Sequence, residues 1–168
     1  MNEFEKFKNI AILEDLTEDQ ISVLFKRCRR VTFDKNDVIM EENEDKHSMF
    51  FFIDGEVIVS NLITMKVSNQ AGYSEAEKSL VRLRAEVVGI LGEMSVFDSQ
   101  PRSATVKAFE PCVLYEIGRE EFEKLIMEHP EIGTKLLFNI AKILCVRVRR
   151  GNSDILKLTT ALSIALSK

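Results

Sequence analysis

The stretch from Gly89 to Thr105 holds the residues of this chain that are best suited to chemistry. Gly92 lets the backbone turn or be approached closely. Residues 93–97 have room for one helical turn, whose free N–H groups can hold an anion, and Arg102 adds a guanidinium that pairs well with phosphate. Because a carboxylate repels phosphate, Glu93 is better suited to accept a hydrogen bond from a ligand hydroxyl. A phosphate beside a hydroxyl indicates a nucleotide.

Other kinds of site find little support in the sequence. The two histidines, His47 and His129, are far apart, and the metal-binding spacings that need several histidines are absent. No GxSxG, HExxH or GxxxxGK[ST] motif occurs. The acidic run Glu41–Asp45 lacks the spacing of a calcium loop and is expected to be a solvated turn. We therefore expect neither an enzyme nor a metal site, and no catalytic residue or cofactor is assigned.

Composition indicates one globular domain. The chain has 168 residues, of which 45% are hydrophobic and 30% charged, so a packed core is expected. With 27 acidic and 23 basic residues the net charge is −4, which argues against bulk electrostatic binding to nucleic acid. Apolar runs such as Met49–Ile53 are too short to span a membrane, and the first nine residues lack the apolar stretch of a secretory signal. The separated cysteines Cys28, Cys112 and Cys145 favour a reducing cytoplasm.

The pattern of apolar residues predicts a mainly β fold with flanking helices. The apolar residues Phe4, Phe7, Ile10 and Ile12 predict a first helix, and Thr17–Gln20 is a capping box that opens a second one. Eight short runs are then expected as strands, with a loop around 68–78: Val31–Phe33, Val38–Met40, Ser48–Ile53, Val57–Ile63, Leu80–Leu83, Val87–Leu91, Ser103–Ala108 and Cys112–Ile117. Their regular spacing predicts an antiparallel β-roll or jelly roll.

Helical periodicity returns after Gly118. Glu120–Glu128 is expected as one helix, and Ile132–Arg150 as a longer helix with a broad apolar stripe. Gly151 and Asn152 are expected to end it, so residues 1–150 form the domain and 151–168 a short helical extension. The basic residues of the long helix are expected along a solvated edge: Lys135, Lys142, Arg147, Arg149 and Arg150.

The run GEMSVFDSQPRSAT, residues 92–105, resembles the phosphate-binding cassette of cyclic nucleotide-binding domains. The family pattern is a Gly-Glu pair, a short helix, and then Arg followed by small residues. Weaker matches occur in the family's order along the chain, including Leu16-Thr17-Glu18, the run FFIDGEV at 51–57, and Phe122. Asn36 and Asn43 stand where the family usually has glycine, and asparagine tolerates positive φ better than most residues.

The resemblance implies roles for the matching positions. Glu93 would take the ribose 2′-hydroxyl, Arg102 the cyclic phosphate, and Gly92 would allow close approach of the sugar. Other ligand contacts would come from amides near Met94 and Ser95, from Ser103, and from apolar residues around the base: Val81, Leu83 and Leu91. The helix 132–150 would be a lid over the base. Since guanine readers of the family tend to have threonine after the arginine, Ser103 favours cyclic AMP, with cyclic GMP left open.

Three functions remain open at this point: a stand-alone cyclic nucleotide sensor, a degenerate fold that acts as a ligand-free protein interaction module, and a site for another small anion. The stripe on Ile132–Arg150 predicts a homodimer, or else closes over the nucleotide with Leu137 or Leu144 near the base. The family's transcription factors add a helix-turn-helix module. The stretch from Gly151 to Lys168 is too short for one, so DNA binding is not expected. The protein partner that receives the signal is not specified.

Overall fold

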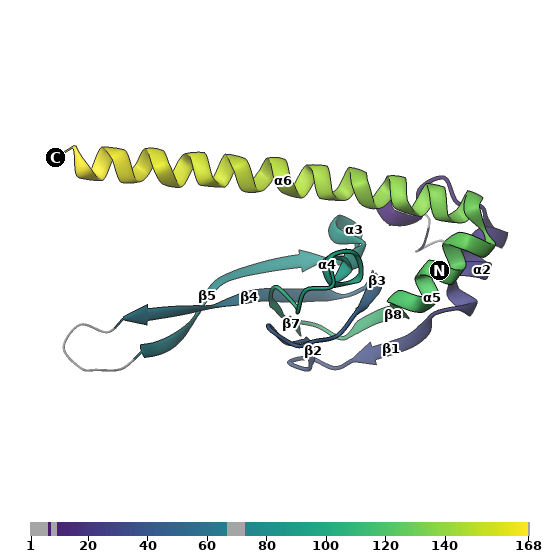
Figure 1. Cartoon of the computed structure of the whole chain (residues 1–168). Coiled ribbons are helices and arrows are strands. Elements are labelled where there is room, and N and C mark those ends of the chain that lie inside the picture. Colours follow the sequence, from purple (N-terminus) through teal and green to yellow (C-terminus); the bar gives the residue numbers. More distant parts are fainter. Residues whose placement is uncertain (1–6, 8–9, 67–72, 168) are drawn as a thin grey trace.

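The protein is a β-roll with helices at one end and one long helix along its side (Figure 1). The computed structural model describes the backbone of residues 7, 10–66 and 73–167, and the side chains of these residues outside 61–80. A 3₁₀ turn covers Ala11–Leu13, and the α-helices are α2 Glu18–Lys26, α3 Ala85–Val88, α4 Glu93–Asp98, α5 Arg119–Glu128 and α6 Pro130–Leu166. The strands are β1 Arg29–Phe33, β2 Val38–Met40, β3 Ser48–Asp54, β4 Glu56–Lys66, β5 Tyr73–Arg84, β6 Ile90–Leu91, β7 Thr105–Ala108 and β8 Cys112–Gly118.

The strands form two antiparallel four-stranded sheets. One has the order β1-β8-β3-β6 and the other β2-β7-β4-β5. In the first sheet Phe51 pairs with Tyr115, and in the second Val57 pairs with Ala108. The eight-stranded antiparallel roll with flanking helices, predicted from the sequence, is confirmed.

Strand β3 supplies side chains to two separate cores because its residues alternate between the faces of the sheet. Phe51 packs with Leu125 and Leu136 in the cluster under α5 and α6. Phe50 and Phe52 point the other way, into the cluster between the two sheets. All three phenylalanines are buried. This strand therefore fixes the roll to the helices that close its end.

The termini of the helices follow the predicted signals in part. The capping box is present, since Thr17 accepts a hydrogen bond from the Gln20 amide and the Gln20 side chain accepts one from the Thr17 amide. Asn36 and Asn43 have φ values of 75° and 67°, as expected for residues in glycine positions. The predicted first helix falls largely on residues outside the described part of the chain.

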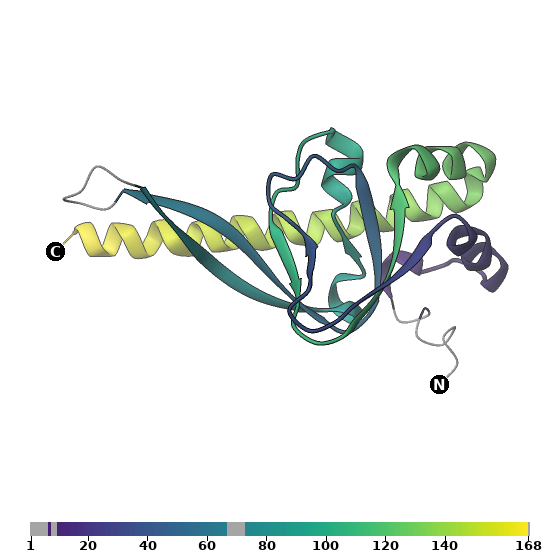
Figure 2. The same ribbon diagram turned by 90° about the horizontal axis from the view of Figure 1, so that it is seen from below.

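The predicted break at Gly151 and Asn152 is wrong. Helix α6 runs without interruption for 37 residues from Pro130 to Leu166. A glycine in an exposed helix costs only about 1 kcal/mol relative to alanine, and no proline follows to force an end. The extension beyond Arg150 is therefore the second part of α6, and it projects past the roll on the same side as the β4–β5 hairpin (Figures 1 and 2).

Two other predicted elements differ in the structure. The hairpin strands are longer than expected, since β4 reaches Lys66 and β5 begins at Tyr73, inside the predicted loop. The predicted strand Val87–Leu91 is instead the helical turn α3, followed by Gly89 and the short strand β6. Gly89 has a φ of 63°, and a Cβ atom there would lie 2.9 Å from Ile10 Cγ2, so the chain can turn here only at glycine.

No helix in the described part of the chain is long and apolar enough to cross a membrane. The three cysteines are free. Burial raises the pKa of Cys28 to about 12 and that of Cys112 to about 11, so both thiols stay protonated at neutral pH.

A buried amide joins α6 to the N-terminal segment. Asn139 is 2% exposed, and its Nδ2 donates to the carbonyl oxygens of Ile12 at 3.2 Å and Glu14 at 2.8 Å. Replacing this side chain leaves both carbonyls without that donor, and the bond to Ile12 is a buried one.

We expect Asn139→Ala to lower the free energy of unfolding by about 1–3 kcal/mol. Thr134→Ala, at an exposed position of the same helix, should change it by less than about 0.5 kcal/mol. Urea unfolding of the two variants and the wild type measures this. An Asn139→Ala variant as stable as Thr134→Ala would contradict the role given to the amide.

Candidate functional site

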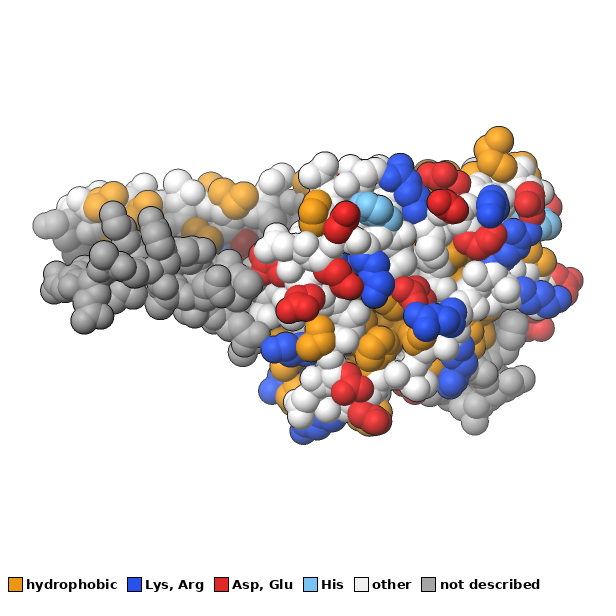
Figure 3. Space-filling model, turned by 60° about the horizontal axis from the view of Figure 1, so that its bottom comes forward, with side chains coloured by type: hydrophobic (Ala, Val, Ile, Leu, Met, Phe, Trp, Pro, Cys, Tyr) orange, Lys and Arg blue, Asp and Glu red, His pale blue; other side chains and the backbone are white. Residues whose placement is uncertain are grey.

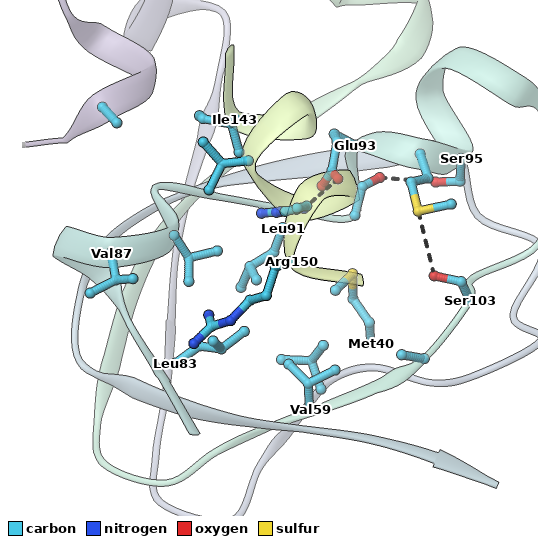
Figure 4. A pocket seen from close by; sticks show the side chains of 18 of the residues that line it. Met40, Val59, Leu83, Val87, Leu91, Glu93, Ser95, Ser103, Ile143 and Arg150 are labelled. Atoms are coloured by element: carbon cyan, nitrogen blue, oxygen red, sulfur yellow. Dashed lines mark hydrogen bonds and ion pairs between the residues drawn. The ribbon is translucent and has the colours of Figure 1, made fainter. Parts of the chain in front are cut away.

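A cavity of about 510 Å³ lies between the roll and α6 (Figure 4). Its wall combines residues of β4, β5, α3, α4 and the α4–β7 segment with one face of α6. The lining residues are Ala11, Glu14, Met40, Val59, Leu83, Val87, Val88, Leu91, Gly92, Glu93, Met94, Ser95, Arg102, Ser103, Ala104, Val106, Asn139, Lys142, Ile143, Val146, Arg147 and Arg150. The volume falls in the usual range for small-molecule sites.

The structure brings eight of the nine sequence-predicted ligand residues to this cavity. They are Leu83, Leu91, Gly92, Glu93, Met94, Ser95, Arg102 and Ser103. Val81 does not line it. This residue lies two positions farther out along β5 than Leu83, where it pairs with Val59 and is 45% exposed. The sequence pattern does not determine which residues of β5 lie level with the cavity, because it does not show how far the β4–β5 hairpin extends.

Arg102 is buried at the base of the cavity, with only 3% of its surface exposed. One terminal nitrogen, Nη1, donates to the Gly92 carbonyl and to Ser95 Oγ, each at 2.8 Å. The other, Nη2, donates to Ser48 Oγ at 3.0 Å. The third nitrogen, Nε, is buried and has no hydrogen-bond partner among the described residues. Burial lowers the pKa of Arg102, opposed by the nearby carboxylates of Glu44, Glu116 and Glu93, so the group is a costly cation with an unused donor.

Gly92 makes room for this guanidinium. It has a φ of 72° and precedes α4, and a Cβ atom at this position would lie 2.3 Å from Arg102 Nη1 and 2.7 Å from the Met40 sulfur. Only glycine fits both the conformation and the space. The next residues, Glu93 to Ser95, begin α4, so their amides have no acceptor within the helix.

A chain of polar groups supports Arg102 from behind. Ser48 Oγ donates to Glu116 Oε1 at 2.9 Å, and Glu116 forms an ion pair with Arg29. Burial acts to raise the pKa of Glu116, but hydrogen bonds from Arg29 and Ser48 outweigh it and hold that pKa below its usual value. Glu116 is therefore ionised at neutral pH and orients Ser48 toward the arginine.

Glu93 is held by the lid helix. Its side chain is 3% exposed, and its Oε1 forms an ion pair with Arg147 Nη1 at 2.5 Å. Arg147 Nη2 also donates to the Ile90 carbonyl at 2.8 Å. The expectation that the basic residues of α6 form a solvated edge is wrong for Arg147, whereas Lys142 is exposed as expected and pairs at the surface with Glu14. Both bind carboxylates on the facing segments, so they fasten α6 to the body of the domain.

One face of α6 forms the lid of the cavity. Ile143, Val146, Arg147 and Arg150 follow the i, i+3, i+4, i+7 spacing of a single helix face. Leu137 and Leu144, the alternatives considered near a base, do not line the cavity. The lining includes four cationic and two acidic side chains, a balance that favours an anionic ligand. Among the described residues, no group of three or more His, Cys, Asp or Glu side chains is placed to hold a metal ion.

Comparison with known proteins identifies the family. The cyclic nucleotide-binding domain matches residues 30–129, and this chain belongs to that family. It is 23% identical to the CRP-like cAMP-activated global transcriptional regulator of Mycobacterium tuberculosis over 145 residues. These residues make up 86% of this chain and 58% of the regulator. A cyclic nucleotide-binding domain from Methylobacillus flagellatus has the same fold, with a TM-score of 0.70 and 23% identity over 90% of this chain and 79% of that one.

A third similarity concerns only part of a larger protein. Glutaminase 1 of Bradyrhizobium diazoefficiens is 25% identical over 150 residues, which are 89% of this chain and 22% of that enzyme. The chain therefore spans little more than half the length of the regulator and less than a quarter of the glutaminase.

The Glu93–Arg147 pair can be measured through stability. Arg147→Ala leaves a buried carboxylate without its cation, and Glu93→Gln leaves the cation without its carboxylate. We expect each single variant to be less stable than wild type and the double variant to be more stable than the sum of both losses predicts. The coupling energy should be about 1 kcal/mol, because Arg147 is 38% exposed and partly screened. A double-mutant cycle by urea unfolding measures it, and additivity of the two losses would contradict the pair.

Proposed function

We propose that this chain is a cyclic nucleotide sensor that binds a purine 3′,5′-cyclic nucleotide, cyclic AMP or cyclic GMP, in the cavity under α6. The observation that carries the proposal is the buried Nε donor of Arg102, which has no partner among the described residues. A buried charged donor is costly unless an acceptor reaches it. The exocyclic oxygens of a cyclic phosphate at the floor of the cavity supply that acceptor and the matching negative charge.

The neighbouring groups suit the rest of the nucleotide. Amides at the start of α4 and the Ser103 region lie beside Arg102 for the remaining phosphate oxygens. Glu93 accepts a hydrogen bond from the ribose 2′-hydroxyl. The same carboxylate is paired with Arg147. Leu83 and Leu91 of the roll and Ile143 and Val146 of α6 provide apolar surfaces for the base.

Signalling follows from the position of α6. A ligand that contacts the roll and α6 together binds more tightly when α6 is closed, and this difference in affinity shifts the equilibrium between closed and open states. Arg147 links the two, because it joins α6 to the residue that takes the ribose. The protein is proposed to act without catalysis, in a reducing cytoplasm. A ligand-free interaction module and a site for a ribose-free anion are the outcomes that binding experiments can support instead.

We further propose that α6 pairs with α6 of a second copy. A heptad pattern of apolar or small residues runs along an outer face of the helix: Leu137, Ala141, Leu144, Val148, Gly151, Ile155, Leu158, Leu162 and Ala165. Val148 and Ile155 occupy one core position and Leu144 and Leu158 the other, which favours a parallel two-stranded coiled coil. This face lies beside the cavity face on the helix, so one helix can close the site and bind its partner.

The far half of α6 has no other cover among the described residues. Ile155, Leu158 and Leu162 are 64%, 71% and 59% exposed. Hydrophobic side chains are visible along this projecting half, whereas charges of both signs are mixed over the roll (Figure 3). After Arg150 the described chain continues as this one helix to Leu166, and its exposed apolar face is the surface on which we place the second copy.

The dimer is tested by two leucines of similar exposure, Leu158 and Leu156. Leu158 is in the heptad seam, and Leu156 is 68% exposed on another face. In sedimentation at tens of micromolar, wild type and Leu156→Glu should be dimers and Leu158→Glu a monomer, because a charge in the seam is desolvated without a partner. A monomeric wild type, or equal effects of the two variants, would rule out this seam.

The phosphate assignment is tested by Arg102→Leu. Loss of the guanidinium should weaken cyclic nucleotide binding by about 2–5 kcal/mol, measured by calorimetry with cyclic AMP, cyclic GMP and AMP. Circular dichroism should show that the fold is retained. Affinity equal to that of wild type would remove Arg102 from the site, and binding of AMP as tight as that of the cyclic nucleotides would favour a general anion site.

The ribose assignment is tested with 2′-deoxy ligands. If Glu93 accepts the 2′-hydroxyl, removal of that hydroxyl should weaken binding to wild type by about 1.5–3 kcal/mol. In Glu93→Gln the difference between ribo and deoxy ligands should shrink. Equal affinity of wild type for the two ligands would leave Glu93 with only its ion pair to Arg147.

A further inference from the structure

The cavity contains one cationic side chain that the proposed contacts leave unused. Of the three basic residues that α6 contributes, Lys142 pairs with Glu14 and Arg147 with Glu93. Arg150 has no hydrogen-bond or ion-pair partner within the described part of the chain. Figure 4 shows its side chain extending from α6 across the cavity toward Leu83, away from Glu93.

The position of Arg150 places its guanidinium at the base end of a bound nucleotide. Arg102 and Glu93 fix the phosphate and ribose at the opposite end of the cavity. Val146, one turn before Arg150 on α6, lines the same cavity as Leu83 and Leu91 of the roll, which supply apolar surface for a planar base. With these apolar side chains packed on the base, the guanidinium of Arg150 is free to meet its edge.

The chemistry of that edge separates the two purines. Guanine presents two acceptors, N7 and O6, at the spacing of the two parallel N–H groups of a guanidinium. Adenine presents N7 and an amino group, which is a donor. Arginine has hydrogen-bond donors only, so it can pair with both N7 and O6 of guanine. On adenine it can pair with N7, but its second N–H group would face the amino group, which is also a donor.

We propose that Arg150 reads the N7–O6 edge of guanine and makes this site selective for cyclic GMP. The inference rests on the proposed function, because it assumes a cyclic nucleotide anchored at Arg102. It reverses the preference for cyclic AMP expected from Ser103. A lysine at this position would keep the charge but lose the paired donors.

The test compares three cyclic nucleotides by calorimetry on the full chain. Cyclic IMP carries O6 and N7 but lacks the guanine amino group, so it should bind as cyclic GMP does. Both should bind about tenfold more tightly than cyclic AMP, the usual effect of one bidentate arginine–guanine contact. Arg150→Ala should bring the three affinities within about twofold, and Arg150→Lys should give an intermediate preference. Arg149→Ala, an exposed neighbour outside the cavity, should retain the wild-type order.

Each other outcome overturns the proposal in an identifiable way. Equal binding of all three ligands, or tighter binding of cyclic AMP, leaves the sensor function intact and removes the guanine reading. A uniform loss in Arg150→Ala would show that the arginine only stacks on the base. A preference that cyclic IMP does not share would place the recognition at the amino group. If wild type binds none of the three, the proposed function itself fails along with this inference.

Discussion

The site depends on one buried guanidinium. Arg102 is buried in the roll, and its guanidinium donates hydrogen bonds to the Gly92 carbonyl, Ser95 and Ser48. These bonds hold the plane of the group while one donor, Nε, stays without a partner. The protein therefore carries the energetic cost of burying a cation, and an anionic acceptor would offset both the charge and the unused donor. The glycine at position 92, the serines and the support by Glu116 all follow from the need to hold that cation in place.

The second constraint is that α6 forms part of the same site. Its fixed end is anchored through Asn139 and Lys142 to the N-terminal segment, and Arg147 reaches the carboxylate of Glu93 in the cavity. Beyond Arg150 the helix leaves the domain and exposes an apolar seam. A single continuous helix thus connects the cavity to this exposed apolar face, which in the proposed dimer would carry a change in the position of α6 to the second copy.

The sequence predicted the parts of this arrangement that are local. The Gly-Glu and Arg-Ser-Ala-Thr groups lie close together along the chain, and their residue types alone indicate a phosphate and a hydroxyl. The strands were recognisable because β3 and β8 are short and strongly apolar. By contrast, Arg147 is 54 residues from Glu93, and a basic residue on a helix gives no sign of its distant partner. The outcome at Val81 was equally unpredictable, since the length of the β4–β5 hairpin decides which residues reach the cavity. The continuation through Gly151 could not be foreseen because a weak helix breaker acts only where the neighbouring residues also favour an end.

The most direct test of the account is the nuclear magnetic resonance signal of the Arg102 Nε–H group, assigned by its loss in Arg102→Leu. Addition of cyclic GMP or cyclic AMP should shift this signal strongly, as a charged acceptor reaches a donor that previously had none. Guanosine, which has the base and the ribose but no phosphate, should leave it in place. A signal that does not move with any cyclic nucleotide, or that moves equally with guanosine, would contradict the claim that this buried guanidinium is the receptor for the phosphate.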